Sequence, residues 1–562
     1  MISIFSNMKF ILKYVIKEEK KLLWINMINV IIGIVETYIG LYISKWIFDG
    51  VNLKNQMNFI IELIIIVTGL IIISIFRILF ARFVQPYSSY NIQRYIVGDL
   101  IKRIVYIPKK KTDDTEYFDK LTRVIGDSKS RPEAVLGTIF ALISALFQGC
   151  IMIIATVYID MEIALVIFIA SVITSVLSFF VNKIGYKQYM EQTTSIRKNE
   201  YIARVIYLPQ FCVDLKNYTN LLSVLLKHFY ASINELKKIL KKYSKLFVLL
   251  EVLAVFVSLI ATNLFPWIVV VNRLYGKAIT NGSAILLLSA AGVLPGVFSS
   301  ILTSFVEFGR HSLYIDNIRE ILNDDYIDQK IEKEELEEVV SLEFKNVSFS
   351  YDNSVDSVFL DVNLSIACGE KIGIIGDNGT GKTTFCMLLN GVYEPCEGEI
   401  LINGKPLSNY TDSSIHNKIV SVNQLFNVYS YSVIENIIMR DVQADDYERV
   451  EEILKEVGLH EKIMSTKNKL DSMITKEFDK DGLCLSGGEL QKIALARIFA
   501  TDPEIIILDE ATCHLDVETE KKVLDSIFAK FYDKTIIMIS HRINLEKSVD
   551  RIIKFTKESI LS

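Results

Sequence analysis

The stretch Gly376-Asp-Asn-Gly-Thr-Gly-Lys-Thr-Thr384 decides the fold of the second half of this chain. The apolar run Lys371-Ile-Gly-Ile-Ile375 before it predicts a short buried strand, and the run Phe385-Cys-Met-Leu-Leu389 after it predicts a helix. A glycine-rich loop between a strand and a helix lets backbone N–H groups converge on phosphate oxygens, and the helix N-terminus attracts their negative charge. The sequence therefore predicts a phosphate-binding loop in an α/β domain.

Two side chains of this loop have the chemistry that phosphate transfer needs. The Lys382 ammonium is expected to reach the β- and γ-phosphates, and the Thr383 hydroxyl to bind Mg²⁺. The other expected contacts to the nucleotide come from Gly376, Asn378, Gly379, Gly381 and Thr384. The strand before the loop and the helix after it favour this site over a glycine-rich turn that binds nothing.

A second candidate anion site, Leu485-Ser-Gly-Gly-Glu489, lies far along the chain from the first. It opens the run Leu490 to Arg497, whose apolar spacing predicts a helix. Phosphate-binding turns so distant in sequence need not serve one nucleotide within one chain. Together the two motifs resemble the ATP-binding cassette (ABC) family over residues 341–555. The resemblance implies that Ser486, Gly487 and Gly488 contact ATP held by the opposite protomer of a dimer.

Two adjacent carboxylates follow a third apolar run. The run Ile505-Ile-Ile-Leu508 predicts a buried strand, and it ends in Asp509-Glu510. A carboxylate at the end of a strand beside a phosphate loop can hold Mg²⁺, and the resemblance assigns this role to Asp509. It assigns Glu510 as the catalytic glutamate, which orients and polarises the attacking water.

Three further residues occur in the order that the family shows. Gln424 follows the predicted strand Ile419–Val422 and resembles the Q-loop glutamine, which can touch Mg²⁺ or the attacking water. His541 follows the predicted strand Thr535–Ile539 and resembles the switch histidine that contacts the γ-phosphate. Tyr351 resembles the aromatic residue that stacks on adenine. A lone residue of these types beside a strand usually packs or caps; their shared order favours the functional interpretation.

Two positions near these motifs have a less defined role. Ala511 to Asp516 resembles the D-loop of the family, a dimer contact, but His514 stands where a small residue is usual, and its role stays open. Glu477 precedes the Ser-Gly-Gly motif, in a stretch that faces the coupling helices of exporters.

The first 320 residues are of a different kind. The chain is 51% hydrophobic with a mean hydropathy of +0.33, too apolar for an ordinary soluble protein. Apolar runs predict six transmembrane helices. They lie near 23–48, 58–82, 136–158, 163–183, 247–271 and 283–305. Residues 1–21 are rich in lysine and show no cleavage site, so we expect an amphipathic helix on the cytosolic face, with no signal peptide and no peptidase domain.

Lysine and arginine counts predict the orientation. The outward loops 49–57, 159–162 and 272–282 contain only Lys54, Arg273 and Lys277, whereas segments 83–135 and 184–246 are dense in basic residues. A positive-inside face explains these basic residues, so nucleic-acid binding is not needed to account for them. The net charge of −5 also argues against a nucleic-acid partner.

The two inward segments are too long for simple turns, so the membrane helices are expected to extend into the cytosol. Each segment has a break where a short cross-helix can lie, at Pro108–Phe118 and at Leu208–Tyr218. This pattern resembles an ABC exporter half-transporter. The predicted fold is therefore a six-span helical transmembrane domain (1–320), a linker (321–340) and an α/β P-loop ATPase domain (341–562).

The resemblance implies an ATP-driven exporter with ATP and Mg²⁺ as cofactors, in the cytoplasmic membrane of a bacterium. A homodimer is expected, and a heterodimer with a second half-transporter is the alternative. The stretches 477–488, 491–497 and 117–121 are similar to bacteriocin and modified-peptide exporters, which favours a peptide cargo. Export of a lipid or lipophilic drug and a peptide-sensing or immunity ATPase are the alternatives.

Glu36 lies near the middle of the first predicted span, where a charge is costly. One interpretation is a cavity acid that meets a cationic group of the cargo. The other is a hydrogen bond to Ser, Thr or Asn within the helix bundle. The sequence leaves both open.

Overall fold

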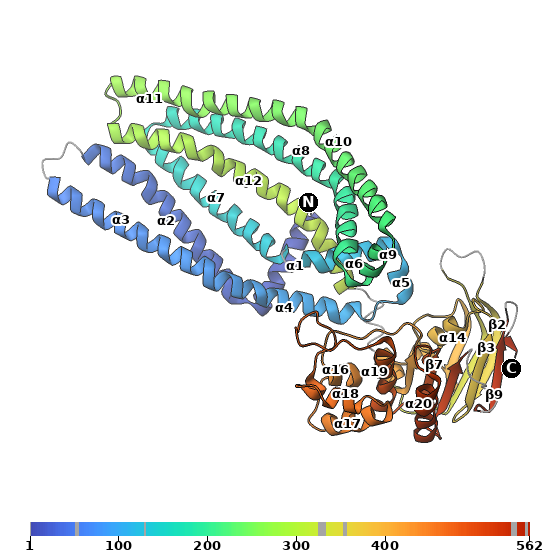
Figure 1. Ribbon diagram of the computed structural model, residues 1–562. Helices are drawn as coiled ribbons and strands as arrows, with labels where there is room; N and C mark the ends of the chain where they lie inside the picture. The colour runs from blue at the N-terminus through green and yellow to red at the C-terminus, as the bar shows by residue number, and fades with distance from the viewer. Residues whose placement is uncertain are drawn as a thin grey trace. The chain divides into compact units, whose positions relative to one another are not determined.

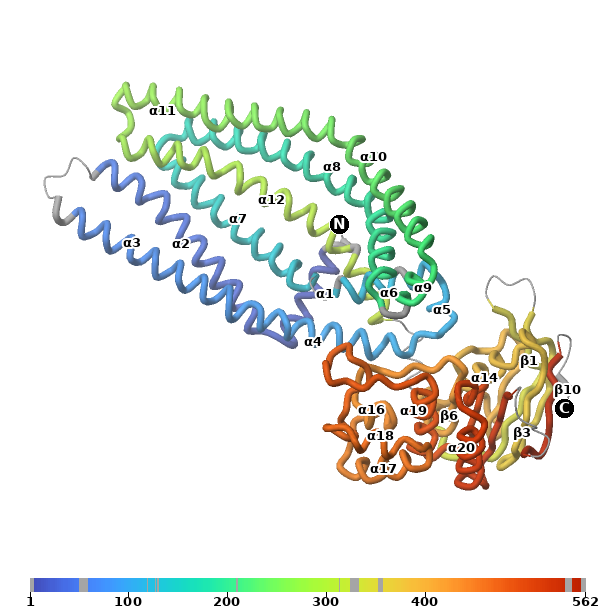
Figure 2. The backbone as a smooth tube through the Cα atoms, in the orientation of Figure 1, coloured from blue at the N-terminus to red at the C-terminus, as the bar shows by residue number. Residues whose placement is uncertain are grey.

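The computed structural model describes residues 2–50, 56–128, 131–323, 333–351, 357–540, 548–556 and 560–561 (Figures 1 and 2). The chain divides into two compact units. The first comprises Met1–Ile101 and Leu121–Leu322, and the second comprises Lys102–Lys120 and Asn323–Ser562. The segment Lys102–Lys120, which joins long helices of the first unit in sequence, thus clusters with the C-terminal part of the chain.

Long helices build the first unit. They are α1 (Ile2–Glu18), α2 (Lys20–Gly50), α3 (Gln56–Leu79), α4 (Gln85–Ile104), α6 (Thr115–Ser128), α7 (Arg131–Ile159), α8 (Met161–Tyr207), α9 (Pro209–Asn217), α10 (Thr219–Ser258), α11 (Phe265–Tyr275) and α12 (Asn281–Leu322). Wide π-helical turns at Phe80–Val84 and Leu259–Leu264 join α3 to α4 and α10 to α11.

Among the described residues, six helical stretches are long and apolar enough to cross a membrane, as the sequence predicts. They are Lys20–Asp49, Phe59–Ile104, Arg131–Ile159, Met161–Tyr207, Thr219–Tyr275 and Asn281–Leu322. Several are much longer than the apolar runs. Helix α8 has 47 residues, which corresponds to about 70 Å against a hydrocarbon layer of about 30 Å. The helices continue past the apolar runs, as the sequence predicts.

Polar contacts join α8 and α10 where both helices lose their apolar character. Glu191 accepts hydrogen bonds from the Lys242 ammonium at 2.9 Å and from the Tyr243 hydroxyl at 2.5 Å. Further along, Glu235 accepts from the Ser195 hydroxyl at 2.9 Å. The two helices therefore stay paired well beyond their apolar parts.

The core of the first unit lies between α2, α7, α8, α11 and α12. Small side chains allow the helices to approach closely: Ala290 and Ala291 of α12 are buried, and a Cβ on Gly149 of α7 would lie 3.4 Å from Val297. Helix α1 is fixed to α12 because the buried Asn7 amide donates to Ser312 Oγ at 2.7 Å and to Asp316 Oδ1 at 2.6 Å.

Glu36 has a partner that the sequence analysis did not consider. Its carboxylate accepts a hydrogen bond from Arg77 Nη1 of α3 at 2.8 Å, which makes an ion pair between α2 and α3. The finding favours the structural interpretation of Glu36, with an arginine rather than Ser, Thr or Asn as the partner.

Breaking this pair is expected to destabilise the first unit. Glu36→Gln leaves the Arg77 guanidinium without a counter-charge beside apolar surroundings, at a cost on the order of 2 kcal/mol. We expect a lower midpoint of thermal unfolding in detergent, and Arg77→Met in the same background should restore it. Lower affinity for a cationic cargo at an unchanged midpoint would instead support the cavity interpretation.

Both predicted cross-helices are present. The first is α5 (Lys109–Asp113), which ends at the extended residue Asp114; the Asp114 carboxylate accepts from the Glu116 N–H at 2.9 Å and so caps the next helix, α6. The second is α9, which begins with Pro209 at a position where the missing N–H has no cost.

The second unit contains two sheets in the described residues. The first sheet, with the order β2-β1-β4-β5, is antiparallel, and the second has the order β10-β9-β3-β8-β7-β6, parallel except for β10. The strands are β1 (Ser341–Phe349), β2 (Phe359–Ala367), β3 (Lys371–Gly376), β4 (Glu397–Ile402), β5 (Lys405–Pro406), β6 (Ile419–Val422), β7 (Ile505–Asp509), β8 (Thr535–Ile539), β9 (Arg551–Phe555) and β10 (Ile560–Leu561). The predicted strands of the parallel sheet are confirmed.

Helices cover this sheet and form a separate helical part. They are α14 (Lys382–Leu389), α15 (Asp412–Lys418), α16 (Val433–Ile438), α17 (Asp446–Glu456), α18 (His460–Met464), α19 (Gly487–Ala500) and α20 (Val517–Lys530). The fully buried strands β7 and β8 read as continuous apolar runs because both of their faces are covered.

Candidate nucleotide site

The parallel sheet gathers the predicted site residues at one edge. Strands β3, β8 and β7 are neighbours, and the register pairs Ile374 with Ile539 and Asp509 with Ile539. Their carboxyl ends therefore meet, and the loops that follow them meet as well. These loops carry the phosphate-binding stretch after β3 and Asp509-Glu510 at the end of β7.

The phosphate loop needs a glycine at 381. This residue caps α14 with a φ of +92°, and a Cβ there would lie 2.7 Å from Val358 Cγ1 and 2.8 Å from the Phe359 ring. Lys382 is 7% exposed, and its ammonium donates to the carbonyls of Gly376 at 2.7 Å and Asp377 at 2.9 Å. The cation is thus held over the loop, where phosphates would bind.

Gly381→Ala is expected to lower ATP affinity by at least about tenfold, because a left-handed residue with a Cβ costs about 1–2 kcal/mol and the clash adds to it. Binding of a fluorescent ATP analogue measures the change. Gly404→Ala is the matched control, since Gly404 also has a positive φ, +74°, but a Cβ there meets nothing within 4 Å. Equal affinity losses in both variants would contradict the prediction.

Asp509 has an environment that fits a divalent cation. It is 2% exposed, and its Oδ2 is buried without a hydrogen-bond partner among the described residues. Burial raises the pKa of Asp509, while a hydrogen bond from Thr383 and the Lys382 charge oppose the rise. A buried carboxylate oxygen with a free acceptor position beside a threonine hydroxyl is a suitable ligand pair for a hard cation such as Mg²⁺.

Glu510 adopts a backbone conformation that is rare for its residue type. Its φ is +50°, and its N–H donates to the Ile539 carbonyl at 3.0 Å, which continues the ladder between β7 and β8. A left-handed non-glycine residue costs about 1–3 kcal/mol and is common at functional sites. The strain falls on the residue that the family resemblance assigns as the catalytic glutamate.

Tyr351 lies beside the first turn of α14. Its hydroxyl is 2.8 Å from Thr384 Oγ1, and its ring makes edge contacts with Phe349 and Tyr393 at centroid distances of 5.1 and 5.5 Å. The ring is 37% exposed, so it has surface available for a stacked base. Tyr393 was missed by the sequence analysis, since nothing in the local sequence points to this contact.

The Ser-Gly-Gly turn is built as a helix start. Ser486 caps α19, where its hydroxyl accepts from the Glu489 N–H at 3.4 Å and the Glu489 carboxylate accepts from the Ser486 N–H at 2.8 Å. This capping box explains the glutamate at 489, and the pattern Ser-x-x-Glu could have revealed it from sequence. A Cβ on Gly488 would lie 3.0 Å from the His514 carbonyl, so the D-loop packs on the turn. Gly487 is the first residue of α19.

The remaining predicted residues are placed as follows. Gln424 is exposed in a bend after β6, and His541 falls outside the described residues. The Glu477 carboxylate accepts from the Ser430 hydroxyl at 2.7 Å. The His514 N–H donates to Gln491 of α19 at 2.9 Å, so the departure from a small residue leaves the D-loop anchored.

Comparison with known proteins identifies the family. Residues 359–513 match the family described as ABC transporter. The chain contains an ABC transporter ATPase domain. The protein hydrolyses ATP and couples the hydrolysis to transport. It combines this domain with six helices that are long and apolar enough to cross a membrane.

The similar proteins differ in how much of the chain they match. The subtilin transport ATP-binding protein SpaT of Bacillus subtilis is 28% identical over 95% of this chain and 87% of its own length. The ATP-dependent lipid A-core flippase of Escherichia coli (strain K12) is 32% identical over 40% of this chain and 39% of its own length. A solved bacterial Atm1-family ABC exporter with ATP bound superimposes with a TM-score of 0.71 at 20% identity, over 95% of this chain and 93% of that one. The predicted exporter fold is confirmed.

Proposed function

We propose that this ABC transporter exports a peptide across the cytoplasmic membrane of a bacterium, as a homodimer that uses Mg-ATP. The similarity to the subtilin transport protein carries the proposal, because it covers 95% of the chain and so includes the membrane helices. Cargo is chosen by the site rather than by the fold, and that site belongs to the membrane part. The flippase similarity covers 40% of the chain and so says less about cargo.

The ATPase residues have distinct roles in this proposal. Lys382 and the loop residues hold the phosphates, Tyr351 stacks on adenine, and Glu510 polarises the attacking water. The Ser486-Gly487-Gly488 turn of the partner chain closes the site, and His541 contacts the γ-phosphate. Thr383, Asp509 and Gln424 would hold Mg²⁺, which neutralises phosphate charge when bound.

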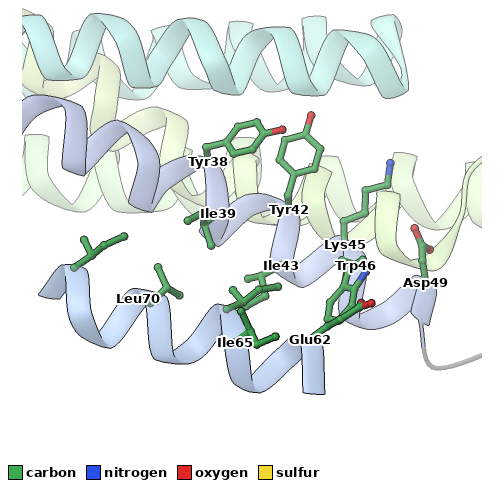
Figure 3. Close-up of a pocket in the computed structure, with 13 residues that line it drawn as sticks. Tyr38, Ile39, Tyr42, Ile43, Lys45, Trp46, Asp49, Glu62, Ile65 and Leu70 are labelled. Carbon is green, nitrogen blue, oxygen red and sulfur yellow. The ribbon is translucent and has the colours of Figure 1, made fainter. Parts of the chain in front are cut away.

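A lipid or lipophilic cargo is the second candidate, and a cleft between α2 and α3 favours it (Figure 3). The cleft has a volume of about 730 Å³. Isoleucines of α2 face Ile65 and Leu70 of α3 across it, and Lys45, Asp49 and Glu62 gather toward one end (Figure 3). An apolar cleft with charged side chains at one end suits an amphiphile such as a lipid.

Transport into inverted membrane vesicles tests the two candidates. Vesicles that contain the protein should accumulate a bacteriocin peptide such as subtilin when Mg-ATP is added, and vesicles with Glu510→Gln should not. ATP-dependent transfer of a fluorescent phospholipid between leaflets, without peptide uptake, would establish the second candidate. Peptide-stimulated ATP hydrolysis without accumulation of either would exclude export.

A further inference from the structure

A short helix of the membrane-helix connection is joined to the ATPase core inside the second unit. Helix α5 ends at Asp113, and Tyr393 follows α14 in the core. The Tyr393 hydroxyl donates to Asp113 Oδ2 at 2.6 Å, and Lys109 donates to the other oxygen, Oδ1, at 2.6 Å. Each carboxylate oxygen of Asp113 therefore has its own donor.

The Tyr393 ring extends this link toward the nucleotide site. It is 8% exposed and makes contacts with Phe349 and Tyr351 at centroid distances of 5.4 and 5.5 Å, the second at an interplanar angle of 88°. Tyr351 in turn reaches Thr384 of α14 through its hydroxyl. Two tyrosine rings thus connect Asp113 to the helix that follows the phosphate loop.

The protonation of the pair makes this hydrogen bond strong. Burial and the bond to Asp113 raise the pKa of the Tyr393 hydroxyl, so it keeps its proton at neutral pH. Burial raises the pKa of Asp113. The hydrogen bonds from Lys109 and Tyr393 outweigh this rise, so the pKa of Asp113 lies below its ordinary value. A neutral hydroxyl that donates to a charged carboxylate forms a short bond, about twice as strong as a neutral pair.

We propose that Tyr393 is a positioning residue for the adenine contact Tyr351, and that Asp113 fixes Tyr393 in place. ATP affinity then depends on whether α5 lies close enough to Tyr393 to keep the Asp113–Tyr393 bond. By linkage, ATP binding favours the conformation in which this bond is formed. The inference rests on the proposed function, because it takes Tyr351 as the residue that stacks on adenine.

Steady-state kinetics of the full-length protein tests the inference. Tyr393→Phe removes the hydroxyl and keeps the ring, and Asp113→Asn removes the charge. Each variant should raise KM for ATP about three- to tenfold and leave kcat within about twofold. The double variant should resemble the single variants, because all three lose the same bond. Neither substitution should add to the effect of Tyr351→Leu.

Inorganic tripolyphosphate separates positioning of the base from general damage to the site. It has no base, so its inhibition constant against ATP should stay unchanged in Tyr393→Phe. Tyr447→Phe is the matched control, because the Tyr447 hydroxyl donates to Asp471 at 2.8 Å in the helical part of the same domain. Its KM for ATP should equal that of the wild type.

The outcomes distinguish this inference from the proposed function. If Tyr351→Leu raises KM but Tyr393→Phe does not, the inference alone is overturned. If Tyr351→Leu leaves KM unchanged, the adenine role of Tyr351 fails and the inference fails with it. A parallel rise in the tripolyphosphate inhibition constant, or an equal KM rise in Tyr447→Phe, would show a structural effect and overturn the inference.

Discussion

Replacing Glu510 with glutamine is expected to reduce ATP turnover by at least about a hundredfold, because an amide cannot accept the proton of the attacking water. Binding of Mg-ATP should persist, since the phosphate loop, Lys382 and Asp509 are unchanged. The left-handed backbone at 510 is as accessible to glutamine as to glutamate, so the fold should be kept. A dimer with trapped nucleotide should therefore accumulate.

Purified protein allows both quantities to be measured, ATP hydrolysis by phosphate release and binding by retained radiolabelled nucleotide. Glu504→Gln is the matched control, because Glu504 lies just before the start of the same strand and pairs with Lys534 at 3.1 Å, away from the site. It should hydrolyse ATP at close to the wild-type rate. Lys382→Ala should behave differently from both and lose nucleotide binding. Near-normal hydrolysis by Glu510→Gln would remove Glu510 from the catalytic role.

Mixing two inactive variants is expected to restore activity. We assume that each nucleotide site uses the phosphate loop of one chain and the Ser-Gly-Gly turn of the other. In a dimer of Lys382→Ala with Ser486→Arg, both substitutions then fall in the same nucleotide site. The second site then stays intact, and ATP hydrolysis should rise well above that of either pure variant. Two affinity tags, purified in sequence, isolate the mixed dimer for the assay.

Ser432 provides the control for this experiment. It caps α16 with the same Ser-Glu capping box that Ser486 forms at α19, so Ser432→Arg disrupts an equivalent helix start elsewhere in the domain. This variant should lose stability but keep its ATP hydrolysis, so its mixed dimer with Lys382→Ala should hydrolyse ATP no faster than pure Ser432→Arg. No gain in isolated dimers of Lys382→Ala with Ser486→Arg would contradict shared sites that work independently.

The sequence predicted the features that depend on neighbouring residues. The strand–loop–helix at Gly376–Thr384, the buried strands β7 and β8, and the six apolar spans follow from local periodicity and glycine content, and the structure has them. The break after α5 was also predictable, because an aspartate before a helix is a strong start signal.

Features that depend on distant residues were not predictable. The Glu36–Arg77 pair joins two helices whose rotation about their own axes is set by packing, not by spacing. The Asp113–Tyr393 bond joins residues 280 positions apart. The left-handed backbone at Glu510 follows from the way β7 ends beside β8, and a single sequence has no signal for it in a non-glycine residue.

Helix α8 is so long that a small tilt of its apolar part moves its far end by a large distance. Some 24 of its residues extend past the apolar part, an arm of about 36 Å, so a tilt of about 10° around the end of the apolar part moves the tip by about 6 Å. Hydrogen bonds to the carboxylates of Glu191 and Glu235 hold α8 and α10 together, and a pair of helices resists bending better than one helix would. A small angular change among the membrane helices would therefore move α9 by several ångströms, because α9 connects the far end of α8 to the start of α10.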